Sequence, residues 1–276
     1  MGDPSGYDPK AFRDLEQEGW GEVSDTYHDT FGNLTGQTVN ALVDAAGIGV
    51  EGLLLDLACG TGRAAMRATQ SGAGVVGLDF VATMVAEARH NAPGAAFCIG
   101  DAQHLPFASS CFGGVISNFG VRHFPVPQLA LTEICRVLKE GGQFAITDWI
   151  SPGALGPLVR EAVAEHGARD ASKPPPGPEA DFSDPASCHE LLAAGGFIGI
   201  ESREVAVNGR WANPEGILAT IYTGMVNSRA ALEVQPPEHR IRVERAIVEK
   251  ARRFEEDGEI RIPSKALLTT ARKPAQ

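Results

Sequence analysis

The stretch Leu53-Leu54-Leu55-Asp56-Leu57-Ala58-Cys59-Gly60-Thr61-Gly62 decides the fold class. Its four leucines, interrupted by one aspartate, are typical of a strand that is buried on both faces. The glycines that follow let the backbone turn sharply and approach a ligand, and residues 63–70 predict a helix directly after them. A buried strand, a glycine turn and a helix together predict the first unit of an α/β domain.

The same alternation of apolar runs and amphipathic segments continues along the chain. Further strands are expected over residues 75–79, 96–99, 114–117, 143–149, 197–207 and 265–270. Helices are expected within residues 11–46, through Met84 and Val85 to His90, and over residues 129–138, 155–167, 211–226 and 238–256. Ser183 is expected to cap another helix, with Pro185 in its first turn. Strands separated by helices imply right-handed crossovers and a parallel sheet covered on both faces.

Composition and charge exclude several classes of protein. The chain has 276 residues, of which 43% are hydrophobic, and this is enough for a sizeable core. It has 24 Lys and Arg against 35 Asp and Glu, a net charge of −11 with no basic block, so nucleic acid is not an expected partner. No stretch approaches the ~18 apolar residues of a membrane helix, and no signal peptide is visible. The sequence therefore predicts a soluble globular protein.

The five cysteines are far apart and form no Cys-x-x-Cys pair. Their odd number and mostly apolar surroundings predict reduced thiols in a cytoplasmic protein instead of a disulfide framework. The same spacing predicts no metal site.

The glycine turn by itself allows two kinds of cofactor. Residues 60–65 match the G-x-G-x-x-G/A fingerprint of dinucleotide-binding proteins. Asp79 follows Gly60 by 19 residues, where an acid that binds a ribose would lie. An NAD(P)-dependent oxidoreductase is therefore one hypothesis.

Three acidic residues favour a different cofactor. Asp56 precedes the glycines at the end of the first strand, where a carboxylate would repel a pyrophosphate but could face a sulfonium or an ammonium. Asp79 ends the second strand and Asp101 follows the third, so all three acids point to one crevice at the carboxyl edge of the sheet. There is also no Tyr-x-x-x-Lys pair to support hydride transfer.

With these residues, the chain resembles the class I S-adenosylmethionine (SAM) methyltransferases over about residues 50–150. It is most similar to the branch of ubiquinone/menaquinone-biosynthesis methyltransferases and many natural-product methyltransferases. The resemblance implies a Rossmann-like, seven-stranded, mostly parallel sheet with helices on both faces and an antiparallel last strand. It also implies one catalytic domain, with an N-terminal helical lid at residues 1–46, a SAM-binding core at 47–150 and acceptor-binding helical insertions within 151–276.

The resemblance further implies which residues bind SAM and its product S-adenosylhomocysteine. In the family, the positions around the glycine turn hold the methionine end, the acid after the second strand holds the ribose, and those after the third strand meet the adenine. Residues after the fourth strand contact the methionine amine through the backbone, and the N-terminal segment closes over the cofactor. The matching residues here are Tyr27, Asp56, Ala58, Gly60, Thr61, Gly62, Asp79, Phe80, Met84, Asp101, Ala102, Asn118 and Phe119.

The acceptor is expected to be a small organic molecule. After the fourth strand, the chain has Ser117-Asn118-Phe119-Gly120 and lacks the Asn/Asp-Pro-Pro-aromatic run of enzymes that methylate nucleic-acid bases. Trp149, Trp211 and Tyr222 either line an aromatic acceptor pocket or belong to the core. Arg122 either pairs with an anionic acceptor or with a surface Glu.

A general base is needed only if the acceptor nucleophile holds a proton. The candidates are His123, His28 and Asp148. The sequence leaves open whether an O, N or C atom is methylated and whether the chain forms a homodimer. It also leaves open a non-catalytic SAM-binding protein, because class I enzymes share no invariant catalytic residue.

Overall fold

The computed structural model describes residues 6–47, 52–150, 155–171 and 173–275. Residues 1–5, on which the expectation of no signal peptide partly rests, lie outside the described residues. Within the described part, eight strands form one sheet in the order β3-β2-β1-β4-β5-β8-β6, with β7 paired to β8 alone. They are β1 (Leu53–Leu57), β2 (Gly74–Asp79), β3 (Ala96–Ile99), β4 (Phe112–Asn118), β5 (Leu138–Trp149), β6 (Ile198–Trp211), β7 (Glu255–Glu256) and β8 (Glu259–Arg272).

The first five strands pair in parallel, and β8 runs antiparallel between β5 and β6. In β1, Leu54 packs with one helical layer, while Leu55 and Leu57 pack with the other. A strand covered on both faces must be apolar at successive positions, which explains the leucine run. The predicted mostly parallel sheet with an antiparallel late strand is confirmed.

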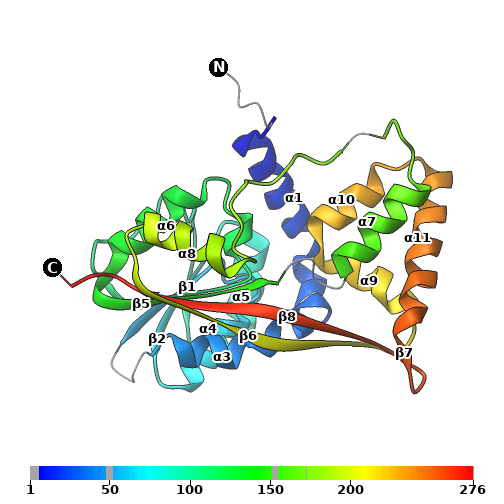
Figure 1. Cartoon of the computed structure of the whole chain (residues 1–276). Helices are drawn as coiled ribbons and strands as arrows, with labels where there is room; N and C mark the ends of the chain where they lie inside the picture. The colour runs from blue at the N-terminus through cyan, green and yellow to red at the C-terminus, as the bar shows by residue number, and fades with distance from the viewer. Residues whose placement is uncertain (1–5, 48–51, 151–154, 172, 276) are drawn as a thin grey trace.

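Two helical layers cover the sheet (Figure 1). The helices α3 (Val39–Ala45), α4 (Arg63–Gln70) and α5 (Ala82–Asn91) pack on one face. The helices α6 (Pro127–Val137) and α8 (Pro185–Ala194) pack on the other. Both layers contribute to the apolar core, so the strand ends are held in fixed relative positions.

A third group of helices gathers beyond the carboxyl edge of the sheet, on the right of Figure 1. We call α7 (Leu155–His166), α9 (Glu215–Gly224), α10 (Val226–Glu233) and α11 (Pro237–Ala251) the helical cap. The N-terminal helix α1 (Pro9–Tyr27) contacts the cap through α9 and α10 and the sheet layer through α5. The short helices α2 (Phe31–Thr35), η1 (Gly36–Thr38), η2 (Val121–His123) and η3 (Arg252–Phe254) complete the described helices.

The cap is attached to the sheet by a long ribbon. Strand β8 pairs with β6 over residues 260–272 but with β5 only over residues 266–272. Residues 260–265 of β8 therefore continue past the sheet as a two-stranded ribbon with β6, toward the cap helices in Figure 1. Strand β7 closes the end of this ribbon through a turn at Asp257 and Gly258, which both have positive φ.

Several predicted boundaries were wrong in the second half of the chain. Asp184, not Ser183, caps α8: its carboxylate accepts from the N–H of Ser187 at 2.9 Å, while the Ser183 hydroxyl donates to Asp181. The helix expected over 211–226 begins only at Glu215, because β6 extends through Trp211, and it ends at Gly224. The helix expected over 238–256 ends at Ala251, before the turn that joins β7 to β8.

None of the helices in the described ranges is long and apolar enough to cross a membrane. The same residues contain no group of three or more His, Cys, Asp or Glu side chains arranged to hold a metal ion.

Candidate active site

The glycine turn between β1 and α4 is built from unusual backbone conformations. Ala58, Gly60 and Gly62 all have positive φ, at 54°, 52° and 82°. A side chain on Gly60 would meet no atom within 4 Å, so this glycine faces open space. A Cβ on Gly62 would instead lie 3.0 Å from the backbone of Ala88 in α5. The turn therefore leaves room beside Gly60 and packs closely at Gly62.

Asp56 is a buried acid without a partner. Its side chain lies in β1 beside the glycine turn and is 1% exposed. Neither carboxylate oxygen has a hydrogen-bond partner among the described residues. Burial raises the pKa of Asp56 to about 7, because the nearby N–H of Ala65 offsets little of the desolvation and the charge of Asp79 opposes ionisation further. A buried polar group left unsatisfied by the protein indicates a position for a ligand.

Asp79 at the end of β2 holds the same turn from the other side. Its Oδ2 accepts from the N–H of Gly60 at 2.8 Å, and its Oδ1 accepts from the N–H of Val81 at 3.0 Å. Burial raises the pKa of Asp79, and these two N–H groups oppose that effect. The carboxylate is thus fixed in orientation with lone pairs left over for hydroxyl donors.

A cavity of about 480 Å³ lies at the carboxyl ends of the strands. Its walls come from residues after β1, β2, β4 and β5 and from α1, α2, α7 and α10. The predicted site residues that line it are Tyr27, Ala58, Gly60, Asp79, Phe80, Met84, Asn118, Phe119 and His123. An adjoining pocket of about 50 Å³ is lined by Asp56 and Thr61 and shares Tyr27, Ala58, Gly60 and Asn118 with the larger one. The structure therefore brings most of the predicted residues to one place.

Three predicted cofactor-binding residues line neither this cavity nor the adjoining pocket: Gly62, which packs against α5, and Asp101 and Ala102. Asp101 accepts from the N–H of Gln103 at 2.9 Å, and its other oxygen pairs with Arg13 of α1 at 3.3 Å. Ala102 is buried in the core cluster that contains Leu105. Neither residue lines the cavity, so their predicted contacts with an adenine stay predictions.

The N-terminal helix supplies apolar and aromatic walls. Val23 of α1 packs with Val81 and Met84, and Phe80 lies against the same cluster. Tyr27 bonds through its hydroxyl to Thr35 at 3.1 Å, and burial raises the pKa of this hydroxyl. A planar ligand group between these side chains would be removed from water.

The segment after β4 is fixed by its polar groups. The Asn118 side chain accepts from Thr38 and from Thr147, each at 2.7 Å, and donates to the carbonyl of Thr35. Phe119 has a φ of 59° and stacks on Trp149 with 4.3 Å between ring centroids. The side chain of Asn118 is thus engaged within the protein, and the Phe119–Trp149 pair presents an aromatic wall to the cavity.

The three candidate bases have different surroundings. His28 binds Thr61 Oγ1 at 3.0 Å through Nδ1 and does not line the cavity, and burial lowers its pKa. Asp148 is buried and pairs with Arg122 at 3.3 Å, so the protein partner of Arg122 is a buried Asp and not the expected surface Glu. Burial raises the pKa of Asp148, and Arg122 opposes that effect. Of the three, only His123 lines the cavity.

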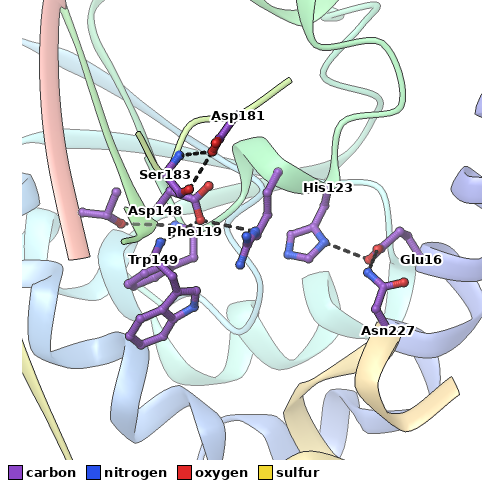
Figure 2. A network of polar contacts seen from close by, with 10 residues as sticks. Glu16, Phe119, His123, Asp148, Trp149, Asp181, Ser183 and Asn227 are labelled. Carbon is purple, nitrogen blue, oxygen red and sulfur yellow. Dashed lines mark hydrogen bonds and ion pairs between the residues drawn. The ribbon is translucent and has the colours of Figure 1, made fainter. Parts of the chain in front are cut away.

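His123 has a partner that sequence analysis missed. Its Nδ1 lies 2.9 Å from Oε2 of Glu16, a fully buried residue of α1 (Figure 2). Glu16 also accepts from Trp20 at 2.7 Å and from Asn227 of α10 at 3.0 Å. Glu16 and His123 are separated by 107 residues, so no local sequence signal joins them.

Trp149 lines the cavity, whereas Trp211 and Tyr222 do not. The Trp211 indole donates to Thr220 at 2.8 Å, and the Tyr222 hydroxyl donates to Glu244. Both pack against the cluster formed by the cap helices. Trp149 packs against this cluster as well, so its position fits both interpretations given above, whereas Trp211 and Tyr222 fit packing alone.

Comparison with known proteins identifies the family. A family model described as a methyltransferase domain matches residues 55–146. A demethylmenaquinone methyltransferase from Mycolicibacterium paratuberculosis is 30% identical over 190 residues, covering 64% of this chain and 77% of the relative. The chain belongs to this methyltransferase family. The resemblance to the ubiquinone/menaquinone branch is thereby confirmed.

Other members and solved structures agree. Four further demethylmenaquinone methyltransferases, including one from Beutenbergia cavernae, are 36–40% identical, but the chain spans only about half of their length, 42–49%. The crystal structure of the YcgJ protein from Bacillus subtilis aligns with a TM-score of 0.59 at 18% identity, over 87% of this chain and 99% of that one. Phosphoethanolamine N-methyltransferase 2 of Haemonchus contortus, in complex with S-adenosylhomocysteine, aligns with a TM-score of 0.53 at 20% identity, over 86% and 52%. At these identities the two structures show the methyltransferase fold alone.

Proposed function

We propose that this protein transfers a methyl group from SAM to a nucleophilic atom of a small organic molecule. The observation that carries the proposal is the buried carboxylate of Asp56, which has no hydrogen-bond partner among the described residues and lies beside the glycine turn. An ammonium group of a bound amino acid would give this carboxylate the partner that the protein does not supply. The residues present therefore fit the methionine end of SAM.

The rest of the cavity supports the same cofactor. Asp79 has free lone pairs for ribose hydroxyls while it holds the N–H of Gly60. Phe80 and Met84 offer an apolar wall for the adenine. When bound, SAM would supply an electrophilic methyl group on a sulfonium. The chain itself binds and orients the reactants and excludes water through α1 and the cap.

The acceptor would lie under the cap, against the Phe119–Trp149 pair. That pair, Phe31 and Trp20 all line the cavity, so its walls suit a planar molecule. The relatives are named demethylmenaquinone methyltransferases, and this supports a small, quinone-like acceptor. His123 is the proposed base, because it is the candidate base whose ring faces this space.

Calorimetric titration with S-adenosylhomocysteine tests the proposal, with NADH and NADPH as controls. We expect micromolar binding of S-adenosylhomocysteine and no heat from either nucleotide. Binding of NADH or NADPH in its place would favour the oxidoreductase hypothesis and contradict the proposal. The absence of binding heat with all three compounds would also contradict the proposal. A protein that binds S-adenosylhomocysteine but methylates no phenol, amine or carboxylate would fit the non-catalytic alternative.

A further inference from the structure

Glu16 joins three distant parts of the chain at the wall of the cavity. It lies in α1, where its Oε2 is 2.9 Å from Nδ1 of His123 in η2, and it accepts from Asn227 of α10 and from Trp20 one turn further along its own helix. Figure 2 shows the carboxylate between the His123 ring and the Asn227 amide. Glu16 is 0% exposed and accepts from two donors besides its contact with His123, and burying a carboxylate charge without such donors would be very costly.

The surroundings of Glu16 favour its ionised form. Burial acts against the charged form, but the charge that His123 carries when protonated and the hydrogen bonds with His123, Trp20 and Asn227 outweigh it and lower the pKa of Glu16. An ionised carboxylate only accepts hydrogen bonds, so the contact with His123 requires a proton on Nδ1. In the neutral imidazole this leaves Nε2 without a proton, as a base needs.

The second ring nitrogen is free to meet a ligand. His123 lines the cavity, and Nε2 has no hydrogen-bond partner among the residues that the structure describes. The ring is also fixed in orientation, because its edge-to-face contact with Trp20 has 5.2 Å between centroids. An imidazole ring that is fixed in orientation, with an unprotonated Nε2 at the cavity, is suited to remove a proton from the acceptor.

We propose that Glu16 is the positioning residue of a Glu16–His123 dyad that removes the proton from a hydroxyl group on an aromatic ring of the acceptor. The inference rests on the proposed function. An aromatic hydroxyl is chosen for two reasons: the cavity wall is the stacked Phe119–Trp149 pair, and a phenol, with a pKa of ~10, holds its proton near neutral pH. An amine that is already neutral would not need this base.

The proposed reaction is a proton transfer coupled to a methyl transfer. Nε2 of His123 takes the hydroxyl proton, and the oxygen uses an electron pair to bond to the methyl carbon. The carbon–sulfur bond breaks, and its electron pair stays on the sulfur, which leaves S-adenosylhomocysteine. The imidazolium that forms lies opposite the ionised Glu16, so the positive charge is stabilised inside the cavity.

Nitrogen NMR of the ligand-free protein tests the positioning role without any acceptor or cofactor. With ¹⁵N-labelled histidine, and a His123→Gln variant to assign the signal, we expect the neutral ring to carry its proton on Nδ1 and none on Nε2. In Glu16→Gln, the new amide can donate to Nδ1, so the form protonated on Nε2 should become populated. Glu18→Gln removes a charge from the exposed side of the same helix and should change nothing. The opposite tautomer in the wild type, or no change in Glu16→Gln, would overturn the positioning role.

A chromogenic phenol tests the acceptor class. 4-Nitrophenol changes colour on ionisation, and in protein saturated with S-adenosylhomocysteine we expect it to bind and to ionise at least one pH unit below its value in water. Glu16→Gln and His123→Gln should return the ionisation toward the solution value, and Glu18→Gln should not. The charged groups that also surround His123 are Asp79 of β2, Asp148 of β5 and the adjacent Arg122, and none of these variants changes them.

The possible failures are distinguishable. Absence of S-adenosylhomocysteine binding would contradict the proposed function, while the tautomer measurement would still report on Glu16. If S-adenosylhomocysteine binds but 4-nitrophenol does not, or binds as the neutral phenol, the acceptor class is overturned. Equal ionisation of the bound phenol in the wild type and in Glu16→Gln would overturn the dyad.

Discussion

Asp56 and Glu16 are both acids withdrawn from water, yet their surroundings are opposite. Asp56 has no hydrogen-bond partner among the described residues, and burial raises its pKa to about 7. Glu16 contacts Trp20, Asn227 and His123, and its pKa is lowered although it is buried as fully as Asp56. Burial therefore does not decide the charge state; the donors supplied by the fold do. The acid that the fold leaves unsatisfied is the candidate for binding a ligand, and the satisfied acid organises its neighbours.

The largest expected effect comes from Asp56→Asn. We expect the affinity for S-adenosylhomocysteine to fall by about 3–5 kcal/mol, because a buried ion pair with the ligand ammonium is lost. The ligand-free protein should instead become more stable. The pKa of Asp56 is raised by about 3 pH units, and at about 1.4 kcal/mol per unit its ionisation costs up to about 4 kcal/mol.

This stability difference has a defined pH dependence. Because the folded-state pKa is raised, the cost of ionised Asp56 grows as pH rises from about 4 to about 7 and is complete above that. Urea denaturation at pH 8 and pH 4 measures it, with the exposed Asp25→Asn as control. If Asp56→Asn is less stable than the wild type at pH 8, the ionised Asp56 does not destabilise the folded protein, and its contrast with Glu16 fails.

Glu16→Gln should change stability in the opposite direction. Loss of charge-assisted hydrogen bonds should destabilise the protein by about 1.5–3 kcal/mol at pH 7. Since the folded-state pKa of Glu16 is lowered, its stabilisation is present above the unfolded value and is lost as pH falls toward acid. The deficit of the variant should therefore shrink below about pH 4. Thermal unfolding at both pH values checks this, and a constant deficit would contradict it.

Asp79→Ala tests an acid that is intermediate between Asp56 and Glu16. Asp79 is buried, and its carboxylate accepts one backbone hydrogen bond on each oxygen. We expect S-adenosylhomocysteine to bind about 1–3 kcal/mol more weakly, as hydrogen bonds to a charged acceptor are lost. Calorimetry measures the loss. Unchanged affinity would remove Asp79 from the cofactor site.

The smallest expected effect is the pH dependence of binding in the wild type. Asp56 must be ionised to pair with an ammonium, so affinity should rise as pH increases through about 7 and level off above it. The change between pH 6 and pH 8 should be about tenfold, or ~1.4 kcal/mol. Asp56→Asn should show no such dependence, and an equal slope in the variant would assign the titration to another group.

The sequence predicted the first half of the fold closely because local patterns determine it. Residues 53–57, 63–70 and 96–99 are a strand, a helix and a strand with the predicted bounds. In the second half the prediction of one helix over 211–226 failed, since the partner strand β8, not the local pattern, extends β6 through Trp211. The turn at Asp257 and Gly258 carried a hairpin signal that could have ended the last helix earlier.

The candidate site divides in the same way. Asp56 and Asp79 were predicted because strand ends meet at one edge of a parallel sheet. Glu16 was not, because an acid in an amphipathic helix looks like a solvent-exposed residue. Its partner Asn227 lies 211 residues away, and only the folded cap brings the two together. Their roles, like those of the other candidate residues, stay predictions until binding is measured.

The ribbon of β6 and β8 is expected to unfold separately from the rest of the sheet. Beyond the sheet, a two-stranded ribbon is marginal by itself. Its inward side chains Val207, Ile260 and Ile262 pack with Ile217 and Ile247 of the cap. We therefore expect the ribbon and the cap to open together as one cooperative unit while the sheet stays folded. Backbone amides within β8 should then exchange with solvent at two rates, faster before residue 266 and slower after it.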